Sequence, residues 1–490
     1  MNSFNIELTT TLSLIAKFVL VRNPIKQMNK QLLHFILLFV FTTFVSCNSK
    51  PKNVVTYFGG KIINPKSRYV ILYSMNKVMD TMFLGKNNQF LGKLKNINEG
   101  LYYFLHGNEN QYIYMVPQDS LMLRLNTWDF DESIVFTGIG SKRNNILIDC
   151  FLKDEKDNKL FYKLNQLEPN KFYVKADSLI TLRKKTYQEY VTNHPNETDD
   201  FNQILKVALT YPIYSRIERY PIAHVKHLNK KDFHIFKDSF YTHRKSVHIN
   251  NHPLMYYPPY AQYARNFLYN KTYSLGYKPM TDGYSSGFTV DLLKTIDRSI
   301  KSEASKNAFL KQTVIGHFYR NSKGDGSYDA FDTYLELSTS NKDKRQVEKL
   351  VQDNKAIHKG QKILNFTLND MNDGVHAIKK LIKNKNVLLF FWNSQYVSKA
   401  YIASKINYLS KKFPKVLFLQ VRIDGSKEAI IPQLDLQKQF YITPKNEANR
   451  YLTSKMPRSI LINRKGIITN SFAAISSKKI ATELKDLSKH

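Results

Sequence analysis

The feature that most constrains the fold is an almost continuous apolar run, NVLLFFW (386–392). Alternating apolar and polar residues are typical of a strand that buries one face. A continuous apolar run is instead typical of a strand covered on both faces of a parallel sheet. An amphipathic stretch (397–414) follows, and a second apolar run, KVLFLQVRID (415–424), comes after it. This order of strand, helix and strand predicts an α/β sandwich.

The residues around these two strands complete the expected C-terminal domain, which we assign to residues 356–490. GQKILNFTLNDMNDG (360–374) predicts a short strand and a turn, and helical material is expected through 446–454. SILINRKGIITNSF (459–472) predicts two antiparallel strands joined at Lys465-Gly466, and a last helix follows.

The preceding residues divide into two parts by their periodicity. Residues 54–144 hold short runs rich in β-branched and aromatic residues, separated by Gly, Asn and Pro, which predict an all-β sandwich or a small barrel. Residues 145–355 carry apolar residues at steps of three and four, which predict a helical middle domain. The expected fold class is therefore multidomain α+β, with an N-terminal β sandwich, a helical middle domain and a C-terminal α/β sandwich.

The N-terminal residues have the pattern of a lipoprotein signal peptide, which we assign to 28–46. A short basic segment precedes an apolar run (32–45), and FVSC (44–47) ends the run with a small residue before cysteine. The apolar run is shorter than the ~20 residues that span a bilayer. The alternative, a buried core helix, is disfavoured by the polar residues that follow at once.

This pattern makes Cys47 a lipidated residue, whose acyl chains anchor the protein to a membrane. Residues 1–27 are then an upstream extension, and 47–53 hold the lipidated cysteine and a linker. The linker has no acidic residue, so we expect an outer-membrane anchor that faces the periplasm. The other cysteine, Cys150, has no partner in the mature chain, and we interpret it as a small buried residue.

The chain is strongly basic, with a formal net charge of +33 at pH 7. Such a charge is typical of proteins that bind nucleic acid or anionic membranes. The lysines are spread over nearly every segment and form no single stripe, so we expect no nucleic-acid partner. We also expect no metal and no cofactor. His224 and His227 have the spacing of metal ligands, but no carboxylate stands at a defined offset, which favours solvated or capping histidines.

A run of tyrosines around two prolines, MYYPPYAQYARNF (255–267), stands within the helical domain. It predicts either a ridge of packed side chains or an aromatic surface for a partner, and we favour packing.

From Gly360 onward the chain resembles the TlpA/ResA-like branch of the thioredoxin superfamily. The resemblance rests on NFTLND, VLLFFW, the helix that follows, and a proline before a strand that ends in Asn463-Arg464-Lys465-Gly466. The β-rich residues before it are similar to the domain that precedes such modules in bacterial envelope lipoproteins. The resemblance implies a thioredoxin-like fold for the C-terminal domain and a location in the cell envelope.

The reactive cysteines of the family are absent. In the family pattern Trp-x-x-x-Cys-x-x-Cys, Trp392 matches the tryptophan, while Tyr396 and Lys399 stand at the cysteine positions. The family reaction needs a thiolate to attack a disulfide and a second thiol to resolve the mixed disulfide, and a phenol and an ammonium do neither. An acid/base pair on one helix face is an alternative for these two residues, but no nucleophile is recognisable beside them. We expect no catalytic residue here.

The resemblance also implies a cis proline at Pro457, next to a groove that binds extended peptide. Met456-Pro457 matches that loop, so Trp392, Met456 and Pro457 are candidate peptide-binding residues. The favoured function is therefore a redox-inactive lipoprotein that binds a peptide or protein partner. The alternative is a thiol-disulfide oxidoreductase that acts through a non-standard site, in which Cys150 works with an outside thiol.

Overall fold

The computed structural model describes residues 54–230, 233–320, 328–425, 430–477 and 479–489. The expected upstream extension (1–27), the signal peptide (28–46) and Cys47 lie outside the described residues. None of the helices within the described ranges is long and apolar enough to cross a membrane.

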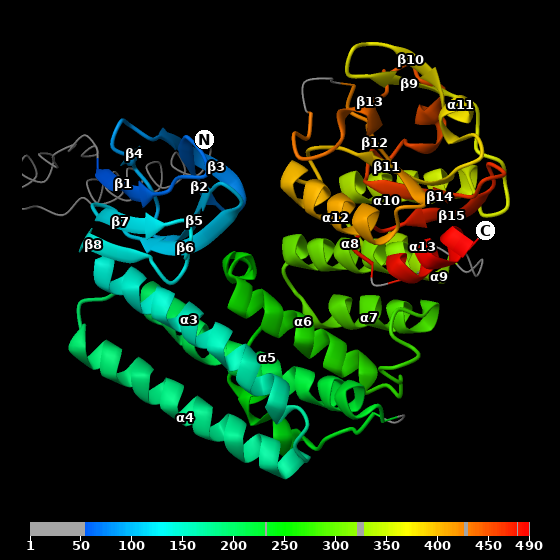
Figure 1. Ribbon diagram of the computed structural model, residues 1–490. Helices are drawn as coiled ribbons and strands as arrows, with labels where there is room; N and C mark the ends of the chain where they lie inside the picture. The colour runs from blue at the N-terminus through cyan, green and yellow to red at the C-terminus, as the bar shows by residue number, and fades with distance from the viewer. Residues whose placement is uncertain (1–53, 231–232, 321–327, 426–429, 478, 490) are drawn as a thin grey trace, which may run out of the picture. The chain divides into compact units, whose positions relative to one another are not determined.

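Two four-stranded sheets form the first part of the described chain (Figure 1). Their strand orders are β4-β1-β7-β8 and β3-β2-β5-β6. Side chains alternate between the two faces of each strand, and the inward ones, such as Phe58 and Phe104, are fully buried between the sheets. The strands are β1 Val55–Ile63, β2 Tyr69–Ser74, β3 Lys77–Phe83, β4 Gln89–Lys95, β5 Gly100–His106, β6 Glu109–Met115, β7 Ser120–Asn126 and β8 Val135–Ile139. The sandwich, one of the two expected forms, is the form observed.

The end of this sandwich differs from the expectation. Most of FTGIG (136–140) lies in β8, which pairs antiparallel with β7. The first helix begins at Ser141, within the range 54–144 that we assigned to the sandwich. Gly140 precedes it with a φ of 93°, a backbone conformation that glycine adopts without strain.

A helical region follows and is built around one large core. Its longest helix, α5, begins after Thr198, whose side chain accepts a hydrogen bond from the N–H of Phe201, a typical N-cap. The helices are α3 Ser141–Leu164, α4 Pro169–Asn193, α5 Asp199–Leu228, α6 Pro258–Tyr273, α7 Ser286–Ser299, α8 Glu303–Arg320, α9 Asp329–Leu337 and α10 Asn341–Ala356, with the short helices η1 Asp238–Lys245 and η2 Pro253–Tyr256.

The tyrosine run around Pro258-Pro259 opens α6, because the fixed φ of proline suits the first helical turn. Tyr260 and Tyr263 are each 1% exposed; Tyr260 stacks on the ring of Tyr211 in α5, and Tyr263 meets that ring edge-on. The packing interpretation of this run is confirmed.

The last part contains a seven-stranded sheet with the order β10-β9-β13-β12-β11-β14-β15. β11 is parallel to β12 and antiparallel to β14, which pairs antiparallel with β15. With α12 between β11 and β12 and α13 after β15, this is a thioredoxin-like α/β sandwich. The elements are β9 Thr367–Asp370, β10 Val375–Ala377, α11 Ile378–Ile382, β11 Asn386–Trp392, α12 Lys399–Lys412, β12 Val416–Arg422, η3 Leu436–Lys438, β13 Gln439–Tyr441, η4 Glu447–Tyr451, β14 Arg458–Ile462, β15 Ile468–Ala473 and α13 Ile480–Lys489.

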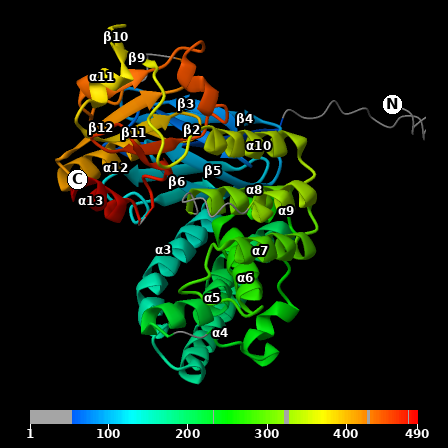
Figure 2. The ribbon, with the colours of Figure 1, turned by 90° about the vertical axis from the view of Figure 1, so that its right-hand side faces the viewer.

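All seven residues of β11 are buried, as expected for a strand covered on both faces. Leu388, Phe390 and Trp392 pack in the core beneath α12 and α13, which lie on the same side of the sheet in both views (Figure 1, Figure 2). The alternate residues of β11 face the core on the opposite side of the sheet.

The hairpin at Lys465-Gly466 is also observed, with Gly466 at a φ of 73°. The helical material expected through 446–454 is only the short helix η4.

Candidate functional site

The two family cysteine positions lie where β11 gives way to α12. Tyr396 stands in the connecting turn, and its N–H donates to the carbonyl of Asn393 at 3.0 Å. Lys399 is the first residue of α12, which is capped by the side chain of Ser398. Because Tyr396 precedes the helix, the two residues do not share a helix face, and this corrects the geometry on which the acid/base alternative rested.

The hydroxyl of Tyr396 already has a partner from another part of the chain. Gln346 of α10 donates its Nε2–H to the Tyr396 Oη at 2.7 Å. Tyr396 remains 39% exposed, and Lys399 is half-buried. Trp392, the residue that matches the family tryptophan, is 2% exposed and lies in the core. A phenol and an amine in these positions offer no group that can form or break a disulfide.

The loop before β14 lies against the helical region. The bond between Met456 and Pro457 is trans, as are all the peptide bonds that the structure describes, so the expected cis proline is wrong. The carbonyl of Pro457 accepts a hydrogen bond from the hydroxyl of Tyr319 at 2.7 Å. Tyr319 comes from α8, and Met456 packs against the core of the helical region. A trans bond is the ordinary isomer, and the surrounding structure decides which isomer an X-Pro bond adopts.

Asp353 of α10 makes the densest set of bonds to this loop. Its carboxylate accepts from the N–H of Thr453 at 2.7 Å, the hydroxyl of Thr453 at 2.7 Å and the N–H of Ser454 at 2.9 Å. Asp353 is 1% exposed. A carboxylate that accepts three hydrogen bonds away from water is strongly held, because ionised acceptors form stronger bonds than neutral ones.

Arg458, the first residue of β14, is also 1% exposed. Its Nη1 donates to the carbonyls of Asp353 at 2.9 Å and Tyr451 at 2.7 Å, and its Nε donates to the carbonyl of Ser471 at 2.8 Å. The guanidinium lies over the ring of Phe472, 4.6 Å from its centroid. Burial lowers the pKa of Arg458 to about 10, and nearby Asp353 opposes that shift. Arg458 therefore stays charged at neutral pH and ties the strand to α10.

Together, α8 and α10 bond to both the turn before α12 and the loop before β14. Gln346 reaches the turn before α12, while Tyr319 and Asp353 reach the loop before β14. Sequence reasoning missed all three residues and Arg458. Asp353 and Thr453 lie 100 positions apart, and neither belongs to a recognisable motif.

Cys150 lies elsewhere, in α3. It is 5% exposed, and burial raises the pKa of its thiol to about 12. The interpretation of Cys150 as a small buried residue is confirmed. At neutral pH the protonated thiol predominates, and the thiolate is the reactive form.

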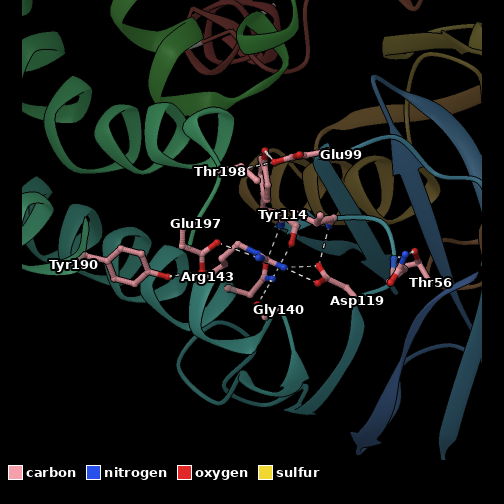
Figure 3. A network of polar contacts seen from close by, with 12 residues as sticks. Thr56, Glu99, Tyr114, Asp119, Gly140, Arg143, Tyr190, Glu197 and Thr198 are labelled. Atoms are coloured by element: carbon pink, nitrogen blue, oxygen red, sulfur yellow. Dashed lines mark hydrogen bonds and ion pairs between the residues drawn. The ribbon is translucent and has the colours of Figure 1, made fainter. Parts of the chain in front are cut away.

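A second polar network joins the sandwich to the helices (Figure 3). Arg143 of α3 lies between two carboxylates, with its Nη2 at 2.7 Å from Asp119 Oδ2 and its Nη1 at 3.0 Å from Glu197 Oε2. Burial raises the pKa of Asp119, while the N–H of Val116 and the guanidinium of Arg143 act against that shift.

The same network includes Glu99, whose carboxylate accepts from the hydroxyls of Tyr114 and Thr198. Burial, together with the hydrogen bond to Glu99, raises the pKa of Tyr114. Each acidic residue labelled in Figure 3 therefore accepts a hydrogen bond from another group of the protein. We interpret the network as a contact that joins the sandwich to the helices.

No protein-family model matches the chain, and no curated protein matches it. Solved structures with similarity to it include the thioredoxin domain of a thiol-disulfide oxidoreductase from Bacteroides vulgatus, with 16% identity over 27% of this chain and 99% of that chain and a TM-score of 0.22. A thiol-disulfide oxidoreductase from Bacteroides fragilis has 20% identity over 26% of this chain and 99% of that one, with a TM-score of 0.23. The exposed lipoprotein thioredoxin of Streptococcus pneumoniae has 19% identity over 25% of this chain and 99% of that one, with a TM-score of 0.20.

Proposed function

We propose that this chain is a redox-inactive, thioredoxin-like lipoprotein of the cell envelope that binds a peptide or protein partner. The observation that carries the proposal is the pair Tyr396 and Lys399 at the positions of the family's two thiols. Disulfide exchange needs a thiolate to attack and a second thiol to release the mixed disulfide. Neither a phenol nor an ammonium replaces either group.

The surroundings of these positions limit where a peptide partner can bind. α8 and α10 bond to the loops on either side of the site, and the carbonyl of Pro457 is occupied by Tyr319. Peptide binding at Trp392, Met456 and Pro457 stays a prediction. An extended peptide that used this carbonyl would have to displace the hydroxyl of Tyr319, so we expect peptide binding to compete with the contact of α8.

The test is a dithiol-linked insulin reduction assay on the purified protein. We expect no rate above that of the Cys150→Ser variant, because Cys150 is buried and its thiol is protonated. A double Tyr396→Cys, Lys399→Cys variant is the matched comparison, since it restores both thiols on the same scaffold. A measurable rate from the unaltered protein would contradict redox inactivity. If Cys150→Ser removed that rate, the alternative of an oxidoreductase with a non-standard site would replace this proposal.

The envelope location rests on the sequence pattern that ends at Cys47. We propose a lipid anchor at Cys47 in the outer membrane, facing the periplasm. Metabolic labelling with a radioactive fatty acid tests it: label is expected in the unaltered protein and absent from Cys47→Ser. Label retained by Cys47→Ser would contradict an anchor at this residue.

A further inference from the structure

A cavity of about 740 Å³ lies where the sandwich meets the helices, well away in sequence from the thioredoxin-like sheet. Residues of β6, α3, α5 and α6 line it, among them Tyr112, Leu147, Ala208 and Gln262. This volume falls within the range of about 300–1,000 Å³ that is typical of small-molecule sites. The proposed function does not use this cavity.

One wall of the cavity is lined mainly by apolar side chains. Leu147, Cys150 and Phe151 contribute to it from α3, Pro212 from α5, and Tyr257 from the residue before α6. Burial raises the pKa of Cys150 to about 12 and also raises the pKa of Tyr257. Both groups are neutral at physiological pH, so this wall favours the apolar part of a ligand.

The polar wall carries more positive than negative charge. Arg216, Arg219 and Arg265 line it, and the lining includes a single carboxylate, Asp154. Arg216 is paired with Asp154, with 2.5 Å between Nη1 and Oδ1. Arg265 donates only to the amide oxygen of Gln312, at 3.4 Å. Within the described residues, Arg219 and Arg265 have no carboxylate partner.

We propose that this cavity binds a small amphipathic carboxylate, with its apolar part against the α3 wall and its carboxylate on Arg219 and Arg265. Guanidinium groups present paired N–H donors that match a carboxylate, and such charge-assisted bonds are stronger than neutral ones. Arg219 and Arg265 are exposed at the cavity, so a cationic ligand would meet two guanidiniums without a carboxylate partner, and a neutral apolar ligand would make no charged bond with them. Charge complementarity therefore selects an anion, and the shape and apolar wall select one with a hydrocarbon or aromatic body.

The test uses dansyl-labelled undecanoate with the full-length protein, with binding followed by the rise in dansyl fluorescence. We expect saturable binding, and we expect its methyl ester to bind about tenfold more weakly or worse, because the ester cannot form charge-assisted hydrogen bonds with the guanidinium groups. The double variant Arg219→Gln, Arg265→Gln should lose affinity for the carboxylate by a similar factor and should leave affinity for the ester unchanged.

The matched control is Arg298→Gln, Arg345→Gln, which removes two exposed arginines outside the cavity. It should bind the carboxylate as the unaltered protein does. An equal loss in this control would mean that the net charge of the chain attracts the probe, and it would overturn the proposal.

A second variant, Ala261→Phe, fills the cavity from α6 and should weaken the binding of both probes. Unchanged binding by Ala261→Phe would place the probe elsewhere and would also overturn it. Neither outcome depends on the reductase assay.

Discussion

The helical region is joined to its two neighbours by different chemistry. Toward the sandwich, the junction contains buried paired charges, with Arg143 between Asp119 and Glu197, beside side chain-to-backbone bonds such as those of Asn144 with Tyr114. Toward the thioredoxin-like sheet, side chains of α8 and α10 bond to backbone groups of a loop, as Asp353 does with the N–H groups of Thr453 and Ser454. Buried ion pairs between side chains therefore distinguish the first junction, while bonds from side chain to backbone dominate the second.

The two junctions therefore differ in the kind of polar group that they provide with hydrogen-bond partners. Side chains such as Arg143 and Asp119 have each other as charged partners, and Asp119 also accepts a hydrogen bond from the N–H of Val116. A loop whose backbone N–H and C=O groups face outward must find partners, since a buried backbone group without one costs free energy. Proteins that bind extended peptides offer such groups to the ligand. Here α8 and α10 supply the partners from within the chain.

The largest effect is expected at Asp353. Asp353→Ala removes the acceptor of three hydrogen bonds and also a carboxylate whose charge favours the buried guanidinium of Arg458. A buried donor left without its partner costs ~1–3 kcal/mol, so we expect a total loss of ~3–5 kcal/mol in urea denaturation. Asp353→Asn keeps one carbonyl acceptor and should lose less. A loss near zero in Asp353→Ala would show that the loop does not depend on α10.

The matching experiment on the sandwich side is Arg143→Ala. It leaves the side chains of Asp119, 3% exposed, and Glu197, 11% exposed, without their cation. We expect a loss of ~3 kcal/mol at pH 7. The loss should shrink as the pH falls, because burial already raises the pKa of Asp119 and protonation removes the unpaired charge.

An exposed pair provides the control for Arg143→Ala. Lys185 and Glu189 are 3.9 Å apart and more than half exposed, so Lys185→Ala should change stability by less than about 0.5 kcal/mol. Equal losses in the two variants would remove the distinction between a buried junction and a surface pair.

A smaller effect is expected at Tyr319. Tyr319→Phe keeps the packed ring but removes the donor to the carbonyl of Pro457. A typical hydrogen bond contributes ~0.5–1.5 kcal/mol, and we expect a loss of about 1 kcal/mol by thermal unfolding. Tyr396→Phe removes the more exposed bond to Gln346 and should cost less. If Tyr319→Phe also increased the binding of an extended peptide, the expected competition between peptide binding and the contact of α8 would gain support.

The last expected effect, at Asp131, carries the opposite sign. Asp131, in the sandwich, accepts from Gln111 Nε2 at 3.0 Å, and burial raises its pKa to about 6. Above pH 6 Asp131 is ionised in the folded protein, and burial makes this charge less favourable there than in the unfolded chain. Asp131→Asn should therefore raise the free energy of unfolding at pH 7. We expect a gain of ~1 kcal/mol, which allows for screening of this partly exposed group by solvent.

The pH profile tests the cause of that gain. Below about pH 4 the carboxyl is protonated in both the folded and the unfolded chain, so the difference between Asp131 and its amide should disappear. A gain that persisted at acid pH would point to packing and not to charge.

The local patterns of the sequence predicted much of the fold. β11 is identifiable because seven neighbouring residues carry its signal, and the hairpin at Gly466 because a turn residue separates two strand-like runs. β13 was not expected, since its three residues form a strand only by pairing with β12 and β9. Short elements of this kind depend on neighbours distant in the sequence.

The candidate site was harder to predict. The positions of Tyr396 and Lys399 follow from a fixed spacing after Trp392, so the sequence places them. The partners of these loops do not follow, because Asp353, Tyr319 and Gln346 lie on helices whose packing no local pattern describes. The isomer at Pro457 is a further case, since the intrinsic preference between the two isomers is only ~0.5–1 kcal/mol and tertiary contacts decide it.

The place of β1 in its sheet has a mechanical consequence. β1 is the first strand of the described chain, yet it lies inside the sheet, antiparallel to β4 and parallel to β7 along almost its whole length. If the chain is tethered through Cys47, tension on the tether enters at the start of β1. Pulling there loads the hydrogen bonds to both neighbours in shear, so many must break together. A strand at the edge, opened one bond at a time, would yield at lower force.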